Sequence, residues 1–279
     1  MQVAIMIHGQ RQDAADAAKD AAVKLRSHGI EVLVEEDMLP FFEKGTVLPI
    51  TSPDAHADVI LSLGGDGTLL HGAQYALAWN AALVGVNFGH VGFLAECEID
   101  ALPRLLDKII SGNYQTLNRA VLSVRAKGKQ WYAVNDVSMT RGGYAHLITV
   151  TAVVDGEQAG RYVGDGVVVA TPTGSTGYSL SAGGPIVSPN VNCMVLTPVC
   201  AHSLQHRPIV VHGGANVQLQ LSAQGAQCAC LQVDGQSYEE LGNGDLIEIS
   251  QSEKTLRLIH TEKKTFFGLV HEKLSEWTR

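Results

Sequence analysis

The chain has no run of lysine or arginine residues, and its formal net charge is −8 over 279 residues. Surfaces for nucleic acid or anionic membrane depend on clustered positive charge, so the sequence argues against both partners. No apolar run approaches the length that spans a bilayer. The opening MQVAIMIHGQ lacks the basic start and long apolar stretch of a secretion signal. We therefore expect a cytoplasmic protein with no nucleic-acid or membrane partner.

The cysteines form no Cys-x-x-Cys pair, and their number, five, is odd. Reduced thiols in an intracellular compartment explain this pattern better than a disulfide framework does. With 46% hydrophobic and 17% charged residues, the composition is that of a soluble, enzyme-like chain rather than a disordered one. The length suits one large domain or two ordinary ones.

Several common catalytic signatures are also missing. The chain has neither a Gly-x-x-x-x-Gly-Lys-Ser/Thr loop nor a Gly-x-Gly-x-x-Gly dinucleotide fingerprint. Ser175 lies in Gly-Ser-Thr-Gly and not in the Gly-x-Ser-x-Gly elbow of serine hydrolases. His202 and His206 are four residues apart, but no glutamate accompanies them and they lie in a part of the chain with almost no helical periodicity. We therefore assign no metal to protein side chains.

The first part of the chain alternates between strand and helix patterns. Gly29 and Gly112 are placed to stop helices, and Asp100 is placed to cap one. This order predicts an α/β domain with a parallel sheet and helices on its faces. We predict strands at 3–7, 31–34, 58–63 and 82–86, helices at 13–27, 69–79 and 100–110, and a loop or lid at 37–56.

The pattern changes near Asn113. From Leu117 to about Ile259 the chain consists of strands and turns with almost no helical periodicity, which predicts an all-β domain. Asp155-Gly156 is typical of a two-residue hairpin turn. Residues 266–277 have apolar side chains at helical spacing. We predict an α/β domain at 1–112, a β-rich domain at 113–262, and a helix within 263–279 that packs back on the first domain.

A glycine-rich turn with one carboxylate, Gly64-Gly65-Asp66-Gly67-Thr68, follows the predicted strand at 58–63. Backbone N–H groups and the helix dipole at such a strand–turn–helix junction favour phosphate. Glycines let the backbone approach a ligand closely. Because a carboxylate repels phosphate, we expect Asp66 to handle a hydroxyl group or Mg²⁺ instead.

A second glycine-rich loop, Asn87-Phe88-Gly89-His90-Val91-Gly92-Phe93, follows the next predicted strand. Loops at the carboxyl ends of adjacent parallel strands line the ligand crevice of an open sheet. We therefore expect the two glycine-rich loops to face the same crevice. Taken alone, this segment is equally well interpreted as an ordinary connecting loop.

Residues 171–185, TPTGSTGYSLSAGGP, combine many hydroxyl groups with open backbone N–H groups and no cation. Such a segment suits hydrogen-bonded recognition of ribose, amide or phosphate oxygens, and a loop of this length is unusual in a compact domain unless it binds something. Asn135-Asp136 follows another predicted strand. Asn can present a donor and an acceptor to an adenine edge, and Asp can accept from ribose hydroxyls, although such a pair alone is more often a turn.

Together these segments resemble the NAD kinase family over nearly the whole chain. The resemblance implies an α/β N-terminal domain with a parallel sheet, an all-β sandwich-like C-terminal domain that binds the dinucleotide, and a homo-oligomer (dimer or tetramer). It also implies phosphoryl transfer from ATP with Mg²⁺ or another divalent cation, or from polyphosphate, to the adenosine-ribose 2′-hydroxyl of NAD. The motifs that carry it are Gly64–Thr68, the loop at 87–93, Asn135-Asp136, TPTGST at 171–176 and Asp234-Gly235-Gln236.

On matched positions, the resemblance makes Asp66 the catalytic residue. The usual Asn-Glu pair is Asn135-Asp136 here, and the usual Ala before Tyr178 is Gly177. The alternatives left open are a lipid or sugar-phosphate kinase with the same glycine-rich turn, and a non-catalytic NADP(H)-sensing module. The NAD-binding residues implied are Asp66, Gly67, His71, Asn135, Asp136, His146, Asp165, Thr176, Gly177, Tyr178, Ser179, Leu180, Ser181 and Gln236, with a supporting loop of Gly64, Gly65, Thr68, Asn87, Gly89 and Phe93.

Overall fold

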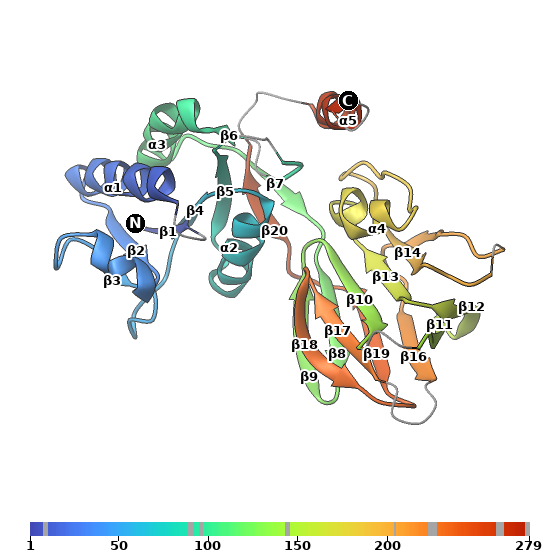
Figure 1. The fold of residues 1–279 in the computed structure, drawn as a ribbon. Coiled ribbons are helices and arrows are strands. Elements are labelled where there is room, and N and C mark those ends of the chain that lie inside the picture. Colours follow the sequence, from blue (N-terminus) through green and yellow to red (C-terminus); the bar gives the residue numbers. More distant parts are fainter. Residues whose placement is uncertain are drawn as a thin grey trace. The chain divides into compact units, whose positions relative to one another are not determined.

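The computed structural model describes residues 1–7, 11–88, 92–94, 97–142, 146–203, 205–222, 228–260 and 265–276. The chain divides into two compact units, one of residues 1–118 with 256–279 and the other of residues 119–255. The first is an α/β unit and the second is built almost entirely of strands, as predicted (Figure 1). No helix among the described residues has the length and apolar character needed to cross a membrane.

An eight-stranded sheet forms the centre of the first unit. Its strand order is β3-β2-β1-β4-β5-β20-β7, and β6 also pairs with β5. The pairs from β3 through β20 are parallel, which confirms the predicted sheet type. The strands are β1 (Gln2–Ile7), β2 (Glu31–Val34), β3 (Leu48–Pro49), β4 (Val59–Leu63), β5 (Ala82–Asn87), β6 (Cys97–Glu98), β7 (Thr116–Arg119) and β20 (Leu256–Ile259).

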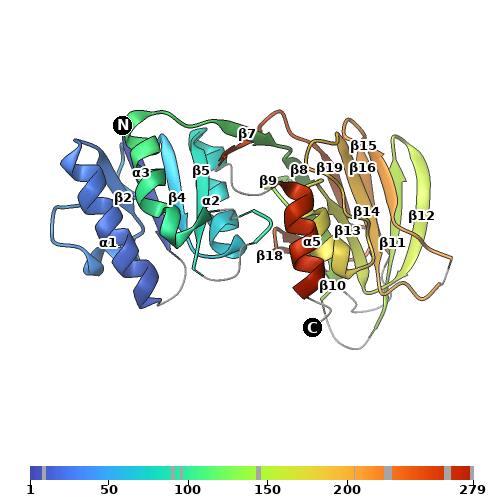
Figure 2. The same cartoon turned by 90° about the horizontal axis from the view of Figure 1, so that it is seen from above.

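Helices cover both faces of this sheet. Helices α1 (Gln12–Ser27) and α3 (Leu102–Ser111) lie side by side, and they share one apolar core with Val3 and Ile5 of β1 (Figure 2). Successive strand residues point to opposite faces. Accordingly, Met6 lies on the other face, beside Gly72 of α2 (Asp66–Trp79).

The ends of these helices test the predicted start and stop signals. Gly29 and Gly112 adopt left-handed φ angles of +75° and +67° after α1 and α3, as their assignment as stops requires. Helix α2 begins at Asp66 and not at Leu69, because the extended backbone of Gly65 takes the N-cap position. The cap predicted at Asp100 is wrong, because the 3₁₀ turn η2 (Ile99–Ala101) precedes α3 and makes Ala101 its N-cap.

The segment predicted as a loop or lid at 37–56 contains short regular structure. The 3₁₀ helix η1 (Glu36–Phe41) begins it, and the buried side chain of Met38 anchors that turn. Strand β3 then pairs with β2 at the edge of the sheet, through Leu33 with Leu48 and Val34 with Pro49. The remaining residues form turns and irregular structure.

The second unit consists of two antiparallel six-stranded sheets. Their strand orders are β15-β14-β13-β10-β17-β18 and β12-β11-β16-β19-β8-β9. Inward-facing residues of both sheets, such as Met139, Leu231, Val150 and Leu219, form one core, which confirms the sandwich. The strands are β8 (Leu122–Ala126), β9 (Lys129–Ala133), β10 (Asp136–Arg141), β11 (Ile148–Val154), β12 (Glu157–Gly164), β13 (Gly166–Ala170), β14 (Cys193–Val199), β15 (Ile209–His212), β16 (Val217–Ser222), β17 (Ala229–Val233), β18 (Gln236–Leu241) and β19 (Leu246–Gln251).

Two hairpins of this unit turn through an Asp-Gly pair. Asp155 and Gly156, between β11 and β12, have φ angles of +50° and +86°. Asp234 and Gly235, between β17 and β18, have φ angles of +48° and +79°. Positive φ at both central residues is typical of a type I′ turn, whose twist matches that of the flanking strands. The hairpin predicted at Asp155-Gly156 is therefore confirmed.

The division into units differs from the boundaries expected at 112 and 262. Strands β7 and β20 belong to the sheet of the first unit, where Leu258 of β20 pairs in parallel with Leu83 of β5. An apolar strand pattern does not reveal which sheet a strand joins, so the sequence placed residues 256–259 with the β-rich domain. Helix α5 (Phe266–Glu276) forms where a C-terminal helix was predicted. Its packing on the first unit stays a prediction, and Trp277 lies outside the described residues.

Candidate functional site

The direction of the strand order in the first sheet changes at β1. Strands β2 and β3 lie on one side of β1, and β4 and β5 lie on the other. In open α/β sheets, ligands bind outside the carboxyl ends of the strands at such a switch point. Strand β4 ends at Leu63. The glycine-rich turn that follows it, Gly64–Thr68, therefore begins at this edge of the sheet.

Asp66 is half-buried at the start of α2, and its carboxylate is held by the second glycine-rich loop. The backbone N–H groups of Phe93 and Leu94 donate to its two oxygens over 3.1 Å and 3.3 Å. A Cβ atom at Gly92 would lie 1.9 Å from an Asp66 carboxylate oxygen, so only glycine permits this contact. The two loops that were expected to face one crevice are thus in direct contact.

The other residues of these two loops have supporting positions. A Cβ at Gly64 would lie 2.3 Å from the Thr68 hydroxyl, so the buried Thr68 requires glycine there. Gly65 and Gly67 are exposed, with open space where a Cβ would stand. Asn87 is buried at the end of β5. Gly89, His90 and Val91 lie outside the described residues. The result is an oriented carboxylate beside accessible glycine backbone.

His71, further along α2, contacts Glu35, the residue that follows β2. Its Nε2 atom lies 2.6 Å from Oε1 of Glu35, and its ring contacts that of Tyr75 edge-on with centroids 5.6 Å apart. The hydrogen bond to Glu35 raises the pKa of His71 above its usual value, against the opposing effect of burial. His71 therefore has a partner within the first unit.

We expect Glu35→Gln to lower the pKa of His71, because the carboxylate is the largest cause of its elevation. A raised histidine pKa stabilises the fold below about pH 6.5, the usual value, and this contribution is lost as the pH rises through the raised pKa. Asp37→Asn is the matched control, since Asp37 raises the His71 pKa by charge alone. NMR titration of the imidazole protons measures both shifts. Equal His71 pKa values in wild type and Glu35→Gln would contradict the assignment.

In the second unit, Asn135 lies between β9 and β10, and Asp136 is the first residue of β10. The Oδ1 atom of Asn135 is buried and has no hydrogen-bond partner among the described residues. A buried acceptor without a donor is costly, so a donor group from a ligand would satisfy it. A Cβ at Gly177 would lie 3.9 Å from Asp136 Oδ2 and 4.0 Å from Asn135 Nδ2. The structure thus brings this pair beside the hydroxyl-rich segment.

Several hydroxyls of that segment are used internally. Thr171 Oγ1 donates to the Val134 carbonyl over 2.6 Å, and Ser175 Oγ donates to the Pro172 carbonyl over 2.6 Å. Ser179 is fully buried, and its hydroxyl lies 2.8 Å from that of Thr197. The segment forms the short helices η3 (Gly174–Thr176) and α4 (Tyr178–Ser181), and the contact between Ser179 and Thr197 joins α4 to β14. Within the segment, Tyr178 and Ser181 are exposed, and Thr176, Gly177 and Leu180 are half-buried.

Tyr178 interacts electrostatically with acidic groups of this region. Its pKa is raised by burial first and then by the charges of Cys200, Asp165 and Asp136, which therefore lie near it. Asp165 also pairs with Arg141, whose Nε is 2.9 Å from Oδ1. The structure thus brings Asn135, Asp136, Asp165, Gly177 and Tyr178 together.

Two other predicted contacts are not part of this group. His146 is exposed before β11, and no contact of its side chain with the group is seen among the described residues. Gln236 is exposed at the start of β18 and accepts a hydrogen bond from the Tyr238 hydroxyl over 3.0 Å. Its turn nevertheless carries Asp234, which contacts the Asn135-Asp136 backbone.

Three residues of the quoted motifs have structural roles that sequence reasoning did not assign. They are Gly92, Gly174 and Asp234. A Cβ at Gly174 would lie 2.0 Å from the Asn135 carbonyl oxygen, and Asp234 accepts hydrogen bonds from the backbone beside that residue. The Asp-Gly pair was a usable signal for a hairpin, but long-range backbone contacts leave no local pattern in the sequence.

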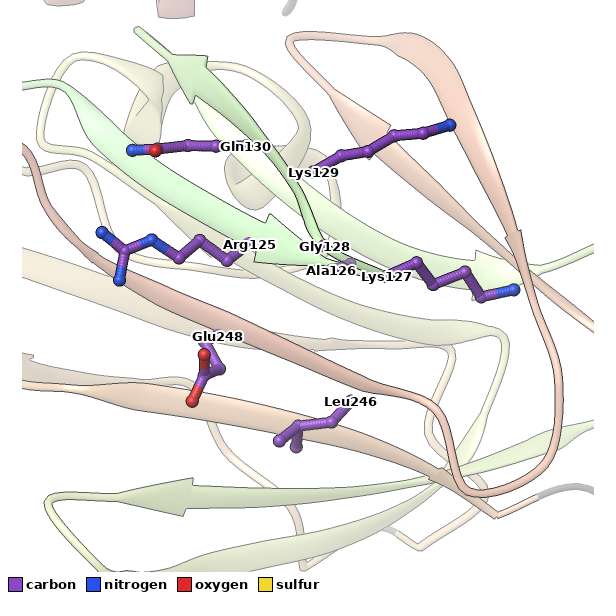
Figure 3. Close-up of a pocket in the computed structure, with 8 residues that line it drawn as sticks. All are labelled: Arg125, Ala126, Lys127, Gly128, Lys129, Gln130, Leu246 and Glu248. Atoms are coloured by element: carbon purple, nitrogen blue, oxygen red, sulfur yellow. The ribbon is translucent and has the colours of Figure 1, made fainter.

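Two surface grooves contain none of the predicted site residues. A groove of about 310 Å³ surrounds the β8–β9 turn, where Lys127 extends from the turn and Arg125, Lys129 and Glu248 extend from strands (Figure 3). Its cations have acidic neighbours: Lys127 pairs with Asp245 over 3.0 Å, Lys129 pairs with Glu239, and Arg125 is opposite Glu248 across β8 and β19. A second groove of about 330 Å³ lies beside β2 and β3.

Comparison with known proteins matches both units. Residues 3–114 match the family profile of the ATP-NAD kinase N-terminal domain, and residues 134–261 match that of the ATP-NAD kinase C-terminal domain. The chain is 40% identical over 224 residues to an NAD kinase of Moorella thermoacetica, covering 79% of this chain and 72% of the relative. It is 32% identical over 278 residues to an NAD kinase of Chlorobium phaeobacteroides, covering 98% and 96% of the two chains.

Solved structures show the same fold. A yeast NADH kinase complexed with NADH has a TM-score of 0.88 and 26% identity, covering 99% of this chain and 87% of that one. An NAD kinase from Archaeoglobus fulgidus in complex with ATP has a TM-score of 0.75 and 25% identity, covering 97% and 99%. These similarities confirm the predicted fold and the prediction of a phosphotransferase with an alcohol acceptor. Because the two profiles together cover most of the sequence, this chain belongs to the NAD kinase family.

Proposed function

We propose that this protein transfers the γ-phosphoryl group of ATP to the adenosine-ribose 2′-hydroxyl of NAD, producing NADP. The observation that carries the proposal is the oriented carboxylate of Asp66 at the start of α2, among exposed glycines. The complexes of related kinases with NADH and with ATP support the two substrates. A homo-oligomer, a cytoplasmic location and the choice between ATP and polyphosphate stay predictions.

In this proposal Asp66 accepts a hydrogen bond from the 2′-hydroxyl and directs its oxygen toward the γ-phosphorus. Phosphoryl transfer passes through a loose transition state, so orientation matters more than early removal of the proton. The bonds from Phe93 and Leu94 keep the carboxylate from rotating. As the new O–P bond forms and the bond to ADP breaks, the hydroxyl proton passes to Asp66.

Asn135 and Asp136 recognise the adenosine part of NAD. Oδ1 of Asn135 needs a donor, which the exocyclic amine of adenine can supply, while Nδ2 can donate to a ring nitrogen. Asp136 is 7% exposed and accepts from ribose hydroxyls in its ionised form. Burial, assisted by the charge of Asp234, raises the pKa of Asp136 to about 7. NAD affinity should therefore weaken as the pH falls below this value.

Mg²⁺, when bound with ATP, neutralises charge on the phosphate oxygens. Such ions are usually held by phosphates and one or two carboxylates rather than by a cage of protein ligands. Asp66 is the carboxylate of the glycine-rich turn, and its oxygen donors suit a hard cation. Within the part of the chain that the structure describes, no group of three or more His, Cys, Asp or Glu side chains could hold a metal ion.

The test is incubation of the purified protein with ATP, Mg²⁺ and NAD, followed by detection of NADP with an NADP-specific dehydrogenase. We expect steady NADP formation that depends on all three components. Diacylglycerol and fructose 6-phosphate serve as alternative acceptors in parallel reactions. Phosphorylation of either one without NADP formation would contradict the proposal and favour a lipid or sugar-phosphate kinase. Tight NADP binding without any turnover would favour a sensing module.

A further inference from the structure

We infer that Asp234 is a positioning residue that sets the orientation of Asn135 and Asp136 through the backbone. The inference rests on the proposed function, because it assumes that these two side chains bind NAD. Asp234 lies in the turn between β17 and β18, about a hundred residues further along the chain, and is separate from the predicted contact residues.

The carboxylate of Asp234 accepts hydrogen bonds from three consecutive backbone N–H groups. Val134 donates to Oδ2 over 2.9 Å, whereas Asn135 and Asp136 donate to Oδ1 over 2.7 Å and 3.1 Å. The backbone N–H of Asp234 donates in return to the Asp136 carbonyl over 2.9 Å. Both carboxylate oxygens are therefore needed, and four hydrogen bonds fix the start of β10 against this turn.

The Asn135 peptide is also held from its other side. The backbone N–H of Thr171 donates to the Asn135 carbonyl over 2.8 Å, and Gly174 packs against the same carbonyl. With both N–H and C=O occupied, the direction of the Asn135 side chain is set by the backbone. Its Oδ1 atom is nevertheless without a partner among the described residues. The surrounding backbone thus fixes the position of Asn135 Oδ1, an acceptor for which the described residues provide no donor.

Turn formation alone does not account for an aspartate at 234. Asn-Gly forms a type I′ turn at least as well as Asp-Gly does, and without a charge. The carboxylate lies beside the buried Asp136, and its charge contributes to the raised pKa of Asp136. Burial also raises the pKa of Asp234 itself to about 6, although its three N–H donors oppose this. A second carboxylate placed beside the buried Asp136 opposes folding, so a role in binding explains the arrangement better.

The chain provides a matched control at Asp155. This residue is also the first of an Asp-Gly turn, its backbone N–H donates to the Asn216 carbonyl, and its Oδ1 accepts from the Asn216 N–H over 2.8 Å. The Asp155 turn connects β11 to β12 and includes no predicted site residue. Asp155→Asn and Asp234→Asn therefore make the same chemical change in the same type of turn.

We expect Asp234→Asn to raise the KM for NAD by about tenfold or more with little change in kcat, because the new NH₂ group faces a backbone N–H donor. Asp234→Gly, which also suits a type I′ turn, removes both acceptors and should raise KM further. Asp155→Asn should leave KM within about twofold of wild type, since an exposed turn contributes little. Initial rates at varied NAD concentrations give KM and kcat as separate values, and thermal melts show that each variant folds.

Two further measurements separate positioning from a merely structural role. Hydrogen exchange of the 134–136 amides should quicken in Asp234→Asn and not in Asp155→Asn. Among the described residues, Asp136 interacts electrostatically with Asp234 and with Tyr178. Without the charge of Asp234, the pH at which the KM for NAD changes should move to lower values. Unchanged KM with faster exchange, or raised KM with an unshifted pH profile, would overturn the inference. Failure of the wild type to make NADP would instead overturn the proposed function on which it rests.

Discussion

Asp66→Asn is expected to retain NAD binding and to lose at least about a hundredfold in kcat, the usual contribution of a positioned proton acceptor. The asparagine keeps the size of the side chain and one oxygen for the Phe93 or Leu94 N–H group. It cannot take up the proton of the 2′-hydroxyl, and its NH₂ group faces a backbone donor. Steady-state kinetics measure kcat, and calorimetric titration with NAD measures binding.

A control for the lost charge is Asp13→Asn. Asp13 lies in the first turn of α1, so its carboxylate also interacts with a helix N-terminus, but it is exposed and pairs with Arg11. We expect this variant to keep wild-type kcat. Near-normal turnover of Asp66→Asn would show that the carboxylate is not the proton acceptor. An equal loss of kcat in Asp66→Asn and Asp13→Asn would point instead to an electrostatic effect of charge at helix N-termini.

The parallel sheet and its glycine-rich turn were predictable because their signals are local. Buried strands such as Val59–Leu63 are continuous apolar runs, and the glycines after them mark the loops at their carboxyl ends. Contact between Asp66 and the loop after β5 followed from the adjacency of β4 and β5. The family resemblance added the residue roles, which local patterns do not carry.

The features that were missed depend on partners distant in the sequence. Strand β20 has an ordinary strand pattern, and only its pairing with β5 assigns it to the first sheet. Asp100 is a good capping residue by type, yet the chain continues through a 3₁₀ turn before α3. Likewise, Asp234 reads as a turn residue, because its bonds to Val134, Asn135 and Asp136 cross about a hundred positions.

Gly174→Ala is expected to have the second large effect, on both stability and NAD affinity. The added Cβ would lie 2.0 Å from the Asn135 carbonyl oxygen and 2.6 Å from its Cα, both backbone atoms that cannot rotate away. Either the η3 turn or the Asn135 peptide must shift. We expect unfolding free energy to fall by about 1–3 kcal/mol, as for other overpacked sites, and the KM for NAD to rise because Asn135 moves.

Gly177→Ala separates this clash from a general effect of adding a methyl group. Gly177 lies three residues later in the same segment, where a Cβ would be 3.4 Å from the Gly174 carbonyl oxygen, an ordinary contact. Urea unfolding of both variants compares their stabilities, and we expect Gly177→Ala to be within about 0.5 kcal/mol of wild type. If Gly174→Ala were equally stable and bound NAD normally, close packing of this turn on Asn135 would not position the adenine-binding side chain.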